Sequence, residues 1–192
     1  MARFAPFEPA PRLAVGLSGG PDSTALVLLA DAWARARGGS VLALIVDHGL
    51  RPESAGEAAA VADRMARLGI EARILTRAGP PPAAGVQAAA RAARHALLQT
   101  ACREYGILHL LLAHTLDDQA ETVLLRLAAG SGPDGLAGMA AVREGREARV
   151  LRPLLGWPKT RLVALCREAG VATVADPGNR DPRFARPRLR AG

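Results

Sequence analysis

A short polar loop near the start of the chain separates two apolar runs. Residues 13–30 read LAVGLSGGPDSTALVLLA, so the first run ends at Leu17 and the second begins within a few residues. Gly19 and Gly20 permit positive φ angles and a close approach of the backbone to a ligand. In open α/β sheets, ligands bind where a strand ends and a helix begins. The loop therefore predicts an α/β fold with a ligand site after its first strand.

Apolar runs and helical periods alternate along the remaining chain, as they do in βαβ units. The strand-like runs occupy residues 12–17, 41–46, 70–75, 107–112 and about 150–151. The helical segments occupy residues 23–37, 54–68, 86–105, 117–128 and 158–170. Ser54 and Glu57 have the spacing of a capping box at the start of the second helix. We predict an α/β fold with a doubly wound, mostly parallel five-stranded sheet and helices on both faces.

Length and composition narrow the class of protein. A chain of 192 residues is long enough for one well-buried domain. No run reaches the ~20 apolar residues that span a bilayer, and the start MARFAPFEPAPR lacks the apolar core of a signal peptide. The sequence has two cysteines, Cys102 and Cys166, and neither belongs to a CxxC pair, so it lacks the ligands of a zinc ribbon or an iron–sulfur site and the cysteines of a disulfide framework. We expect a cytoplasmic protein without membrane contact.

The positive charge is concentrated toward the C-terminus. The net charge is +7: residues 1–140 carry 13 basic and 13 acidic side chains, and residues 141–192 carry 12 basic and 5 acidic ones. Lys159 is the sole lysine, and every other basic residue is arginine. A basic segment on a neutral body is typical of proteins that bind a polyanion, and nucleic acid is the first candidate.

The loop SGGPDS has the chemistry of a phosphate site, because backbone N–H groups at the start of a helix attract anions. Pro21 and Asp22 stand where a Walker A loop requires glycine and lysine, and the pattern GxGxxG is absent. The phosphate charge must then be met by Mg²⁺, with Asp22 as a ligand, or by arginines from elsewhere. A plain glycine-rich turn is the alternative. The predicted phosphate-binding residues are Ser18, Gly19, Gly20, Pro21, Asp22, Ser23 and Thr24.

Polar residues also follow the second and fourth predicted strands. Asp47 and His48 in VDHGLRPES follow the second, where doubly wound sheets hold the base or ribose of a nucleotide, although a simple turn is the alternative. The segment AHTLDDQAET contains His114, Asp117, Asp118 and Glu121. One imidazole among carboxylates favours Mg²⁺ over zinc, and capping of the helix is the alternative.

Arg91 and Arg94 are spaced three residues apart and share one face of the predicted helix 86–105. Surface charge is the ordinary explanation for such residues. Guanidinium groups, however, bind phosphate oxygens in a bidentate manner and would supply the cations that the loop lacks.

Together these motifs resemble those of the N-type ATP pyrophosphatases and, within that superfamily, those of the tRNA(Ile)-lysidine synthetases. The matching stretches keep the family's order from residue 13 to 190: LSGGPDS, VDHGLRPES, AARAARH, AHTLDDQAET, RLAAGSGPDGLAGM, LRPLL and DPGNRDPRFARPRLR. SGGxDS marks the superfamily alone, whereas VDHGLRPES, HxxDDxxET and the DPxN tail are more specific. The departures from the family's pattern are His95, Ala113, Thr115 and Pro187.

The resemblance implies an ATP-dependent ligase. ATP adenylates the C2 oxygen of the wobble cytidine, position 34, of a tRNA(Ile) with a CAU anticodon, and pyrophosphate is released. The side-chain amine of L-lysine then expels AMP and leaves lysidine. ATP and Mg²⁺ are the implied cofactors, tRNA(Ile) and L-lysine are the partners, and a homodimer is among the assemblies allowed. A tRNA thiolase of the same superfamily and a non-catalytic ATP-binding module are the rival hypotheses.

The resemblance also implies one catalytic domain, residues 1–192, with a nucleotide-binding core at 12–140 and a basic part at 141–192 that contacts tRNA. The residues that it assigns to catalysis are Asp22, Arg91, Arg94, His114, Asp117 and Asp118. The residues that it assigns to lysine or tRNA are Glu121, Arg152, Arg186, Arg188 and Arg190.

Overall fold

The computed structural model describes residues 1–47, 49, 52–76 and 86–174, with the backbone alone for residues 86–90. The predictions that lie outside the described residues are those for His48, Arg186, Arg188 and Arg190. Within the described part of the chain, no helix is both long enough and apolar enough to span a bilayer.

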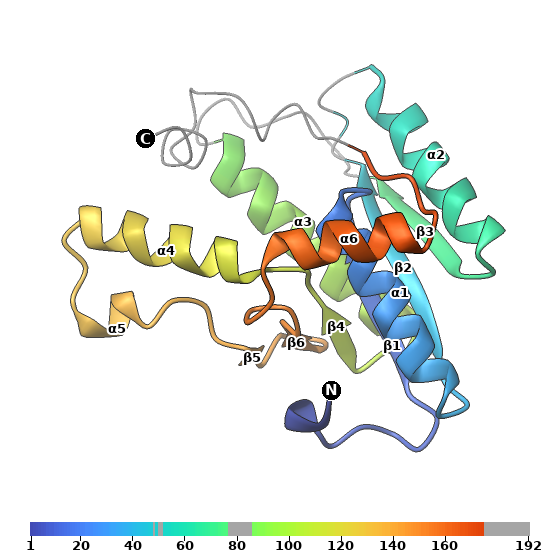
Figure 1. Ribbon diagram of the computed structural model, residues 1–192, viewed down its shortest axis with the longest axis horizontal. Coiled ribbons are helices and arrows are strands. Elements are labelled where there is room, and N and C mark those ends of the chain that lie inside the picture. The colour runs from blue at the N-terminus through green and yellow to red at the C-terminus, as the bar shows by residue number, and fades with distance from the viewer. Residues whose placement is uncertain (48, 50–51, 77–85, 175–192) are drawn as a thin grey trace.

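In the part of the chain that the structure describes, six strands form one sheet in the order β3-β2-β1-β4-β6-β5 (Figure 1). They are β1 (Arg12–Leu17), β2 (Ser40–Asp47), β3 (Glu71–Thr76), β4 (His109–Leu111), β5 (Val142–Arg143) and β6 (Arg149–Leu151). Every neighbouring pair is parallel except β5 with β6. The chain winds outward from β1 to β3 and then crosses to β4 on the other side of β1, which confirms the doubly wound sheet. The predicted count of five strands is wrong, because the two-residue β5 is too short to produce an apolar pattern.

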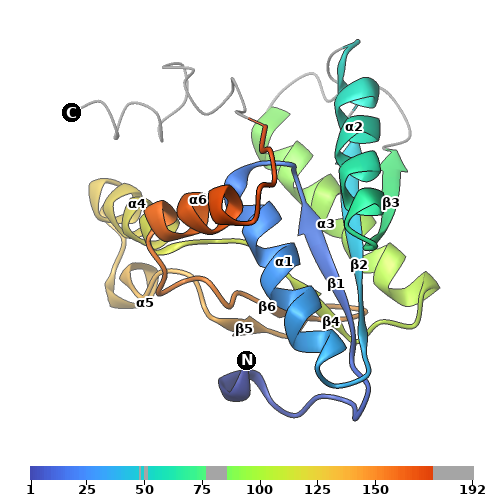
Figure 2. The ribbon, with the colours of Figure 1, turned by 45° about the vertical axis from the view of Figure 1, so that its right-hand side comes forward.

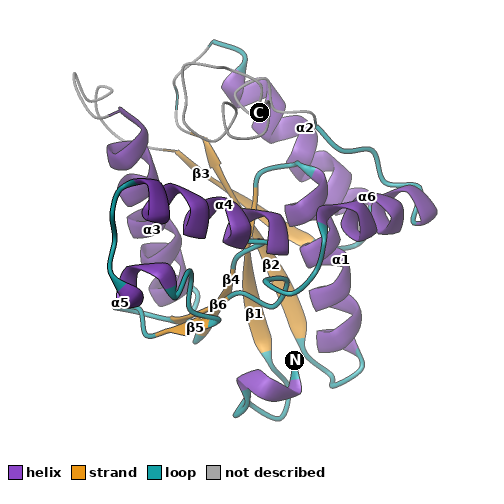
Figure 3. Ribbon diagram, turned by 60° about the vertical axis from the view of Figure 1, so that its left-hand side comes forward, coloured by secondary structure: helices purple, strands orange, loops and turns teal. Residues whose placement is uncertain are grey.

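Helices cover both faces of the sheet, as predicted. They are α1 (Pro21–Arg35), α2 (Ser54–Arg67), α3 (Val86–Glu104), α4 (Leu116–Ala128), α5 (Pro133–Leu136) and α6 (Lys159–Glu168), after a 3₁₀ turn at Ala2–Phe4. In Figure 3 the strands lie between α3 on one side and α1 and α2 on the other. Figure 2 shows α6 beside the first turns of α1. The helix α4 begins at the carboxyl end of the sheet and extends away from it with α5 (Figure 1).

The core consists of two apolar layers, one on each side of the sheet. Val15 of β1 belongs to the layer beneath α1, α2 and α6, and its neighbour Ala14 belongs to the layer beneath α3. Both residues are fully buried, which explains why a central parallel strand reads as a continuous apolar run instead of an alternating one. Burial on both faces fixes the end of β1, and therefore the position of the loop that follows it.

The capping box predicted at Ser54 is wrong. The N-cap of α2 is Glu53, whose φ and ψ of −79° and −13° are already helical, and no side chain caps that end. A capping box instead begins α4, where the N-cap Thr115 is extended and exchanges hydrogen bonds with Asp118. The spacing of such residues is not sufficient, because the hydroxyl must come from the extended residue just before the first turn.

Candidate active site

The loop between β1 and α1 is held in shape by its own hydrogen bonds. Gly19 has a φ of +81°, and Gly20 is the extended N-cap of α1. The Ser23 hydroxyl donates to the Gly20 carbonyl (3.1 Å) and accepts the Ser18 N–H (3.2 Å). Ser23 therefore supports the loop from within, and the N–H groups at the start of α1 keep the orientation that favours an anion.

Gly19 is sterically required at its position, and we expect Gly19→Ala to destabilise the fold. A Cβ there would lie 2.7 Å from Val61 Cγ2 and 3.3 Å from Val174 Cγ2, in addition to the strain of the positive φ. The free energy of unfolding measured with urea should fall by roughly 2–3 kcal/mol.

Two other glycines provide controls for Gly19→Ala. Gly38 shares the positive φ but has open space around it, so Gly38→Ala should cost only the strain, about 1–2 kcal/mol. Gly56 is helical and also unobstructed, so Gly56→Ala should raise the stability by roughly 0.5–1 kcal/mol. Equal losses for Gly19→Ala and Gly38→Ala would contradict the steric argument.

Asp22, in the first turn of α1, provides the carboxylate of this loop. Its Oδ2 lies 3.3 Å from Lys159 Nζ, and its buried Oδ1 has no hydrogen-bond partner among the described residues, as is also true of the Thr24 hydroxyl. Burial raises the pKa of Asp22, Lys159 opposes this, and the charges of Asp118 and Asp117 raise the pKa further. An unpartnered carboxylate oxygen beside other acids is suited to a divalent cation.

Among the residues that the structure describes, no group of three or more His, Cys, Asp or Glu side chains is placed to hold a metal ion. Mg²⁺ commonly binds through one or two carboxylates together with substrate phosphates, and Asp22 fits that donor set.

The acids at the start of α4 have structural partners. Asp118 Oδ2 accepts hydrogen bonds from the N–H and the hydroxyl of Thr115, at 2.9 and 3.1 Å. Asp117 Oδ2 accepts the backbone N–H of Lys159 at 2.9 Å, so it satisfies one of the free donors at the start of α6. Capping of its own helix, the alternative that the sequence left open, therefore describes Asp118, whereas Asp117 binds the start of α6 instead. Thr115, a departure from the family pattern, is explained by its role as the N-cap.

His114 follows β4 and is neutral at physiological pH. Arg152 Nε donates to its Nδ1 at 3.3 Å. Burial lowers the pKa of His114 to about 4; Asp118 acts in the opposite direction, and Arg152, Arg94 and Arg91 lower the pKa further. Since Nδ1 accepts a hydrogen bond, the proton of the neutral ring is on Nε2. His114 can therefore donate a hydrogen bond to a ligand, and is a weak base.

A cluster of arginines surrounds His114. Arg91 and Arg94 of α3 and Arg152, which follows β6, all influence its charge. Burial, followed by Arg91, lowers the pKa of Arg94. Arg143 Nη2 also lies 3.1 Å from His95 Nε2. The positive charges of Arg91 and Arg94 of α3 therefore act on His114, which follows β4.

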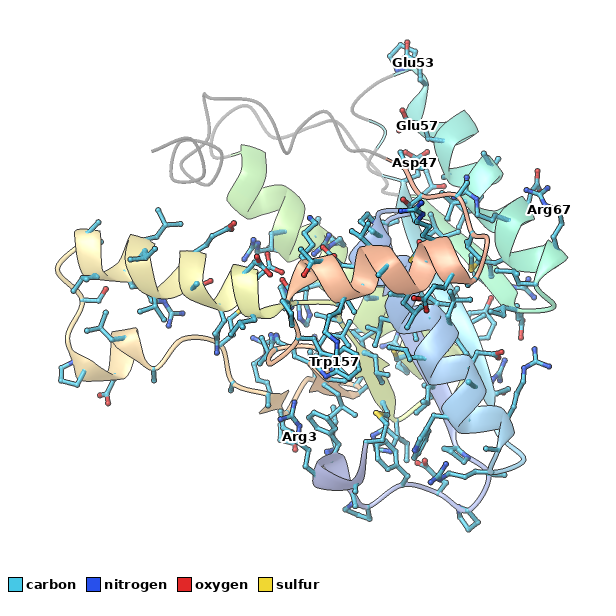
Figure 4. The ribbon with its side chains drawn as sticks, viewed as in Figure 1. Arg3, Asp47, Glu53, Glu57, Arg67 and Trp157 are labelled. Carbon is cyan, nitrogen blue, oxygen red and sulfur yellow. The ribbon has the colours of Figure 1, made fainter. Side chains whose placement is uncertain are left out.

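The remaining predicted residues lie at the same edge of the sheet or next to it. Asp47 ends β2, is buried, and accepts the Gly49 N–H at 2.9 Å. This hydrogen bond agrees with the turn that was the alternative interpretation of Asp47. Figure 4 shows it beside the first turns of α2. Glu121 is buried one turn after Asp117 on α4. Lys159 was not among the predicted site residues, although its being the sole lysine was a usable signal.

A family model described as a PP-loop domain matches residues 2–192. The chain belongs to the PP-loop domain family. This confirms the superfamily that the motif SGGPDS indicated, and residues 18–24 are called the PP-loop below. The PP-loop follows β1, and the order of the strands reverses between β1 and β4. Open α/β sheets bind ligands at such a topological switch point.

Curated relatives confirm the resemblance to the tRNA(Ile)-lysidine synthetases. The tRNA(Ile)-lysidine synthase of Rhodopseudomonas palustris is 50% identical over 189 residues, which are 97% of this chain and 55% of that protein. The corresponding protein of Bradyrhizobium sp. BTAi1 is 52% identical over 98% of this chain and 53% of that protein. This PP-loop chain thus spans about half the length of the curated relatives it matches.

Solved structures share the fold. The U34-tRNA thiolase NcsA from Methanococcus maripaludis, with its [4Fe-4S] cluster, has a TM-score of 0.77 at 19% identity, over 93% of this chain and 63% of that one. The phosphoadenylyl-sulfate reductase from Candida auris has a TM-score of 0.52 at 12% identity, over 85% of this chain and 75% of that one. At these identities the likeness establishes the PP-loop fold alone.

Proposed function

We propose that this chain carries the catalytic site of a tRNA(Ile)-lysidine synthase. It uses ATP to adenylate the C2 oxygen of cytidine 34 in a tRNA(Ile) with a CAU anticodon, and it then ligates L-lysine at C2 with release of AMP. The observation that carries the proposal is that the PP-loop lies at the same edge of the sheet as His114, Asp117 and Asp118. Lys159 connects the two parts, because its ammonium group pairs with Asp22 and its backbone N–H donates to Asp117. The high identity to curated synthases supports it.

In this proposal the PP-loop binds the phosphates of ATP. The N–H groups at the start of α1 face the phosphate oxygens, and the orientation of the loop depends on Ser23 and Gly20. Asp22 would hold Mg²⁺, which neutralises phosphate charge when bound. Arg91 and Arg94 add positive charge on the side of α3. Positioning and charge stabilisation at the α-phosphorus then supply most of the acceleration.

The residues around β4 would act on the base and on lysine. Neutral His114 donates a hydrogen bond from Nε2, and Arg152 keeps the imidazole in that tautomer. The carboxylates at the start of α4, Asp117 and Asp118, together with the buried Glu121, give the site the negative charge that binds the ammonium group of L-lysine. The nucleophilic amine must lose a proton, and a carboxylate near it can accept that proton.

The proposal divides the chain by charge. Residues 12–140 form the nucleotide-binding core, and the arginines of the basic part, residues 141–192, contact tRNA within the same catalytic domain. Aromatic residues are only 3% of the chain, so phosphate contacts should outweigh base stacking. The proposed tRNA contacts are Arg152, Arg186, Arg188 and Arg190. His48 and Asp47 are proposed to face the nucleoside of ATP, and a cytoplasmic protein is proposed, with a homodimer as an allowed assembly.

The cysteines disfavour the rival thiolase reaction. Cys102 and Cys166 are both buried, in the apolar layers on opposite sides of the sheet. Burial raises the pKa of the Cys102 thiol to about 12, so that it stays protonated. An iron–sulfur cluster needs several thiolates around one position, which these cysteines do not provide.

A labelled-lysine assay tests the proposal. With ATP and Mg²⁺, the chain should transfer labelled L-lysine to tRNA(Ile) carrying a CAU anticodon, and pyrophosphate release should depend on that tRNA. With tRNA(Met), both signals should fall by at least about 10-fold, since each wrong contact costs roughly 1–3 kcal/mol. ATP binding with no lysine transfer and no tRNA-dependent pyrophosphate would favour the non-catalytic module instead.

A further inference from the structure

The PP-loop contains no cationic side chain of its own. Residues 13–30 include no lysine, arginine or histidine. Backbone N–H groups contribute only partial positive charge at the start of a helix, whereas a triphosphate carries several full negative charges. Lys159 brings a full positive charge to this loop from a distant part of the sequence, because its Nζ lies 3.3 Å from Asp22 Oδ2.

The position of Lys159 is set by the fold. The segment from α6 onward contacts successive parts of the loop: Lys159 meets Asp22, Cys166 Sγ donates to the Pro21 carbonyl at 3.4 Å, and Val174 N–H donates to the Gly19 carbonyl at 2.8 Å. Leu162 of α6 is completely buried in the core. The segment therefore contacts the loop at Asp22, Pro21 and Gly19, and these contacts keep Lys159 beside the loop.

The first turn of α6 is also attached to α4. The Lys159 N–H donates to Asp117 at 2.9 Å, and the Leu116 N–H donates to the Trp157 carbonyl at 3.1 Å. Figure 1 shows the starts of the two helices side by side. Lys159 thus stands between the PP-loop and the acidic start of α4.

An ion pair alone is a weak reason for a lysine at this position. The side chains of Lys159 and Asp22 are 36% and 22% exposed, and pairs that are partly open to water contribute about 0–1 kcal/mol. An ammonium group has three donors, and the contact with Asp22 uses one of them. The remaining donors are available to a ligand with several acceptor oxygens.

We propose that Lys159 is the phosphate-binding cation of the PP-loop. Its ammonium group contacts the triphosphate of ATP and then the departing pyrophosphate, and Asp22 holds it beside the loop when no nucleotide is bound. The inference rests on the proposed function, since it takes ATP as the ligand. On binding, Lys159 exchanges a carboxylate partner for phosphate oxygens, which leaves the Asp22 carboxylate available to a metal ion.

Binding of ATP and of inorganic pyrophosphate, measured by calorimetry in magnesium-free buffer, tests this inference. Lys159→Met should raise both dissociation constants about 10- to 50-fold, because hydrogen bonds from a charged donor are lost. Lys159→Arg keeps the charge and should remain within about 3-fold of the wild type. Arg161→Met is the matched control: it removes one charge from the same turn, where Arg161 lies over the Trp157 ring (4.6 Å), and should change neither constant.

Asp22→Asn separates a phosphate role from a structural ion pair. If the pair only anchored α6, Asp22→Asn and Lys159→Met would weaken pyrophosphate binding alike. If Lys159 binds phosphate, Asp22→Asn should tighten pyrophosphate binding in magnesium-free buffer. The substitution removes a carboxylate that repels the anion, and it releases the ammonium group of Lys159. Unchanged binding by Lys159→Met, an equal loss with Arg161→Met, or weaker binding by Asp22→Asn would each overturn the inference.

The outcome for the wild type distinguishes this inference from the proposed function. A wild-type chain that binds neither ATP nor pyrophosphate overturns both. A wild-type chain that transfers lysine to tRNA, while Lys159→Met keeps its full pyrophosphate affinity, overturns the role of Lys159 alone.

Discussion

Replacement of Asp22 by alanine is expected to lower lysine transfer about 10²- to 10³-fold, because a metal ion that neutralises phosphate charge stabilises the transition state by several kcal/mol. Asp22 Oδ1 is buried without a hydrogen-bond partner in the described residues, so the carboxylate has an oxygen to offer. The loss should not come from unfolding, since the partly exposed pair with Lys159 contributes at most about 1 kcal/mol. Lysine transfer and thermal unfolding, both measured across a Mg²⁺ titration, separate the two effects.

Asp31→Asn is the control for this variant. Asp31 lies on the same helix and pairs with Arg35 at 2.7 Å, so its removal takes a similar charge from α1 at a distance from the loop. Turnover should then stay within about 2-fold of the wild type, because a surface pair at this spacing is worth about 0.3–0.5 kcal/mol. Wild-type turnover in Asp22→Ala would exclude the metal role of Asp22.

Replacement of His114 by alanine is expected to lower turnover about 10²-fold, since the loss of a preorganised hydrogen-bond donor typically costs 10²–10³ in rate. His114→Gln retains an N–H donor and should recover part of the rate. Burial lowers the pKa of His114 to about 4, so the ring is neutral at every pH above about 5. The pH–rate profile between pH 5.5 and 8 should therefore contain no step from this residue.

The titration of His114 checks the same assignment independently of activity. In the folded chain its ring signals in NMR should remain those of neutral imidazole down to about pH 5, and the proton should be on Nε2. The neutral ring is favoured by folding, so stability conferred by a lowered pKa is present above pH 6.5 and is lost as the pH falls toward 4. A step near pH 6.5 that disappears in His114→Gln would show that His114 acts as a base instead.

Local features of the sequence predicted the architecture correctly. The apolar run that ends at Leu17 and the glycines after it specify a buried strand followed by a tight turn, and Gly19 indeed has a positive φ. The parallel sheet followed from the alternation of strands and helices. The two-residue β5 was missed because a strand of that length carries no periodic signal, and it forms only where β6 offers an edge.

The sequence by itself determined which chemical groups are present: a glycine-rich loop without a lysine, a histidine before an acidic helix start, and arginines at helical spacing. Only the tertiary structure decided how they are used. Asp118 caps α4 through Thr115, Asp117 holds the start of α6, and Lys159 lies against Asp22. Hydrogen-bond partners depend on distances between segments that are remote along the chain. These distances are set by the packing of the helices against the sheet, and the spacing of residues in the sequence does not predict them.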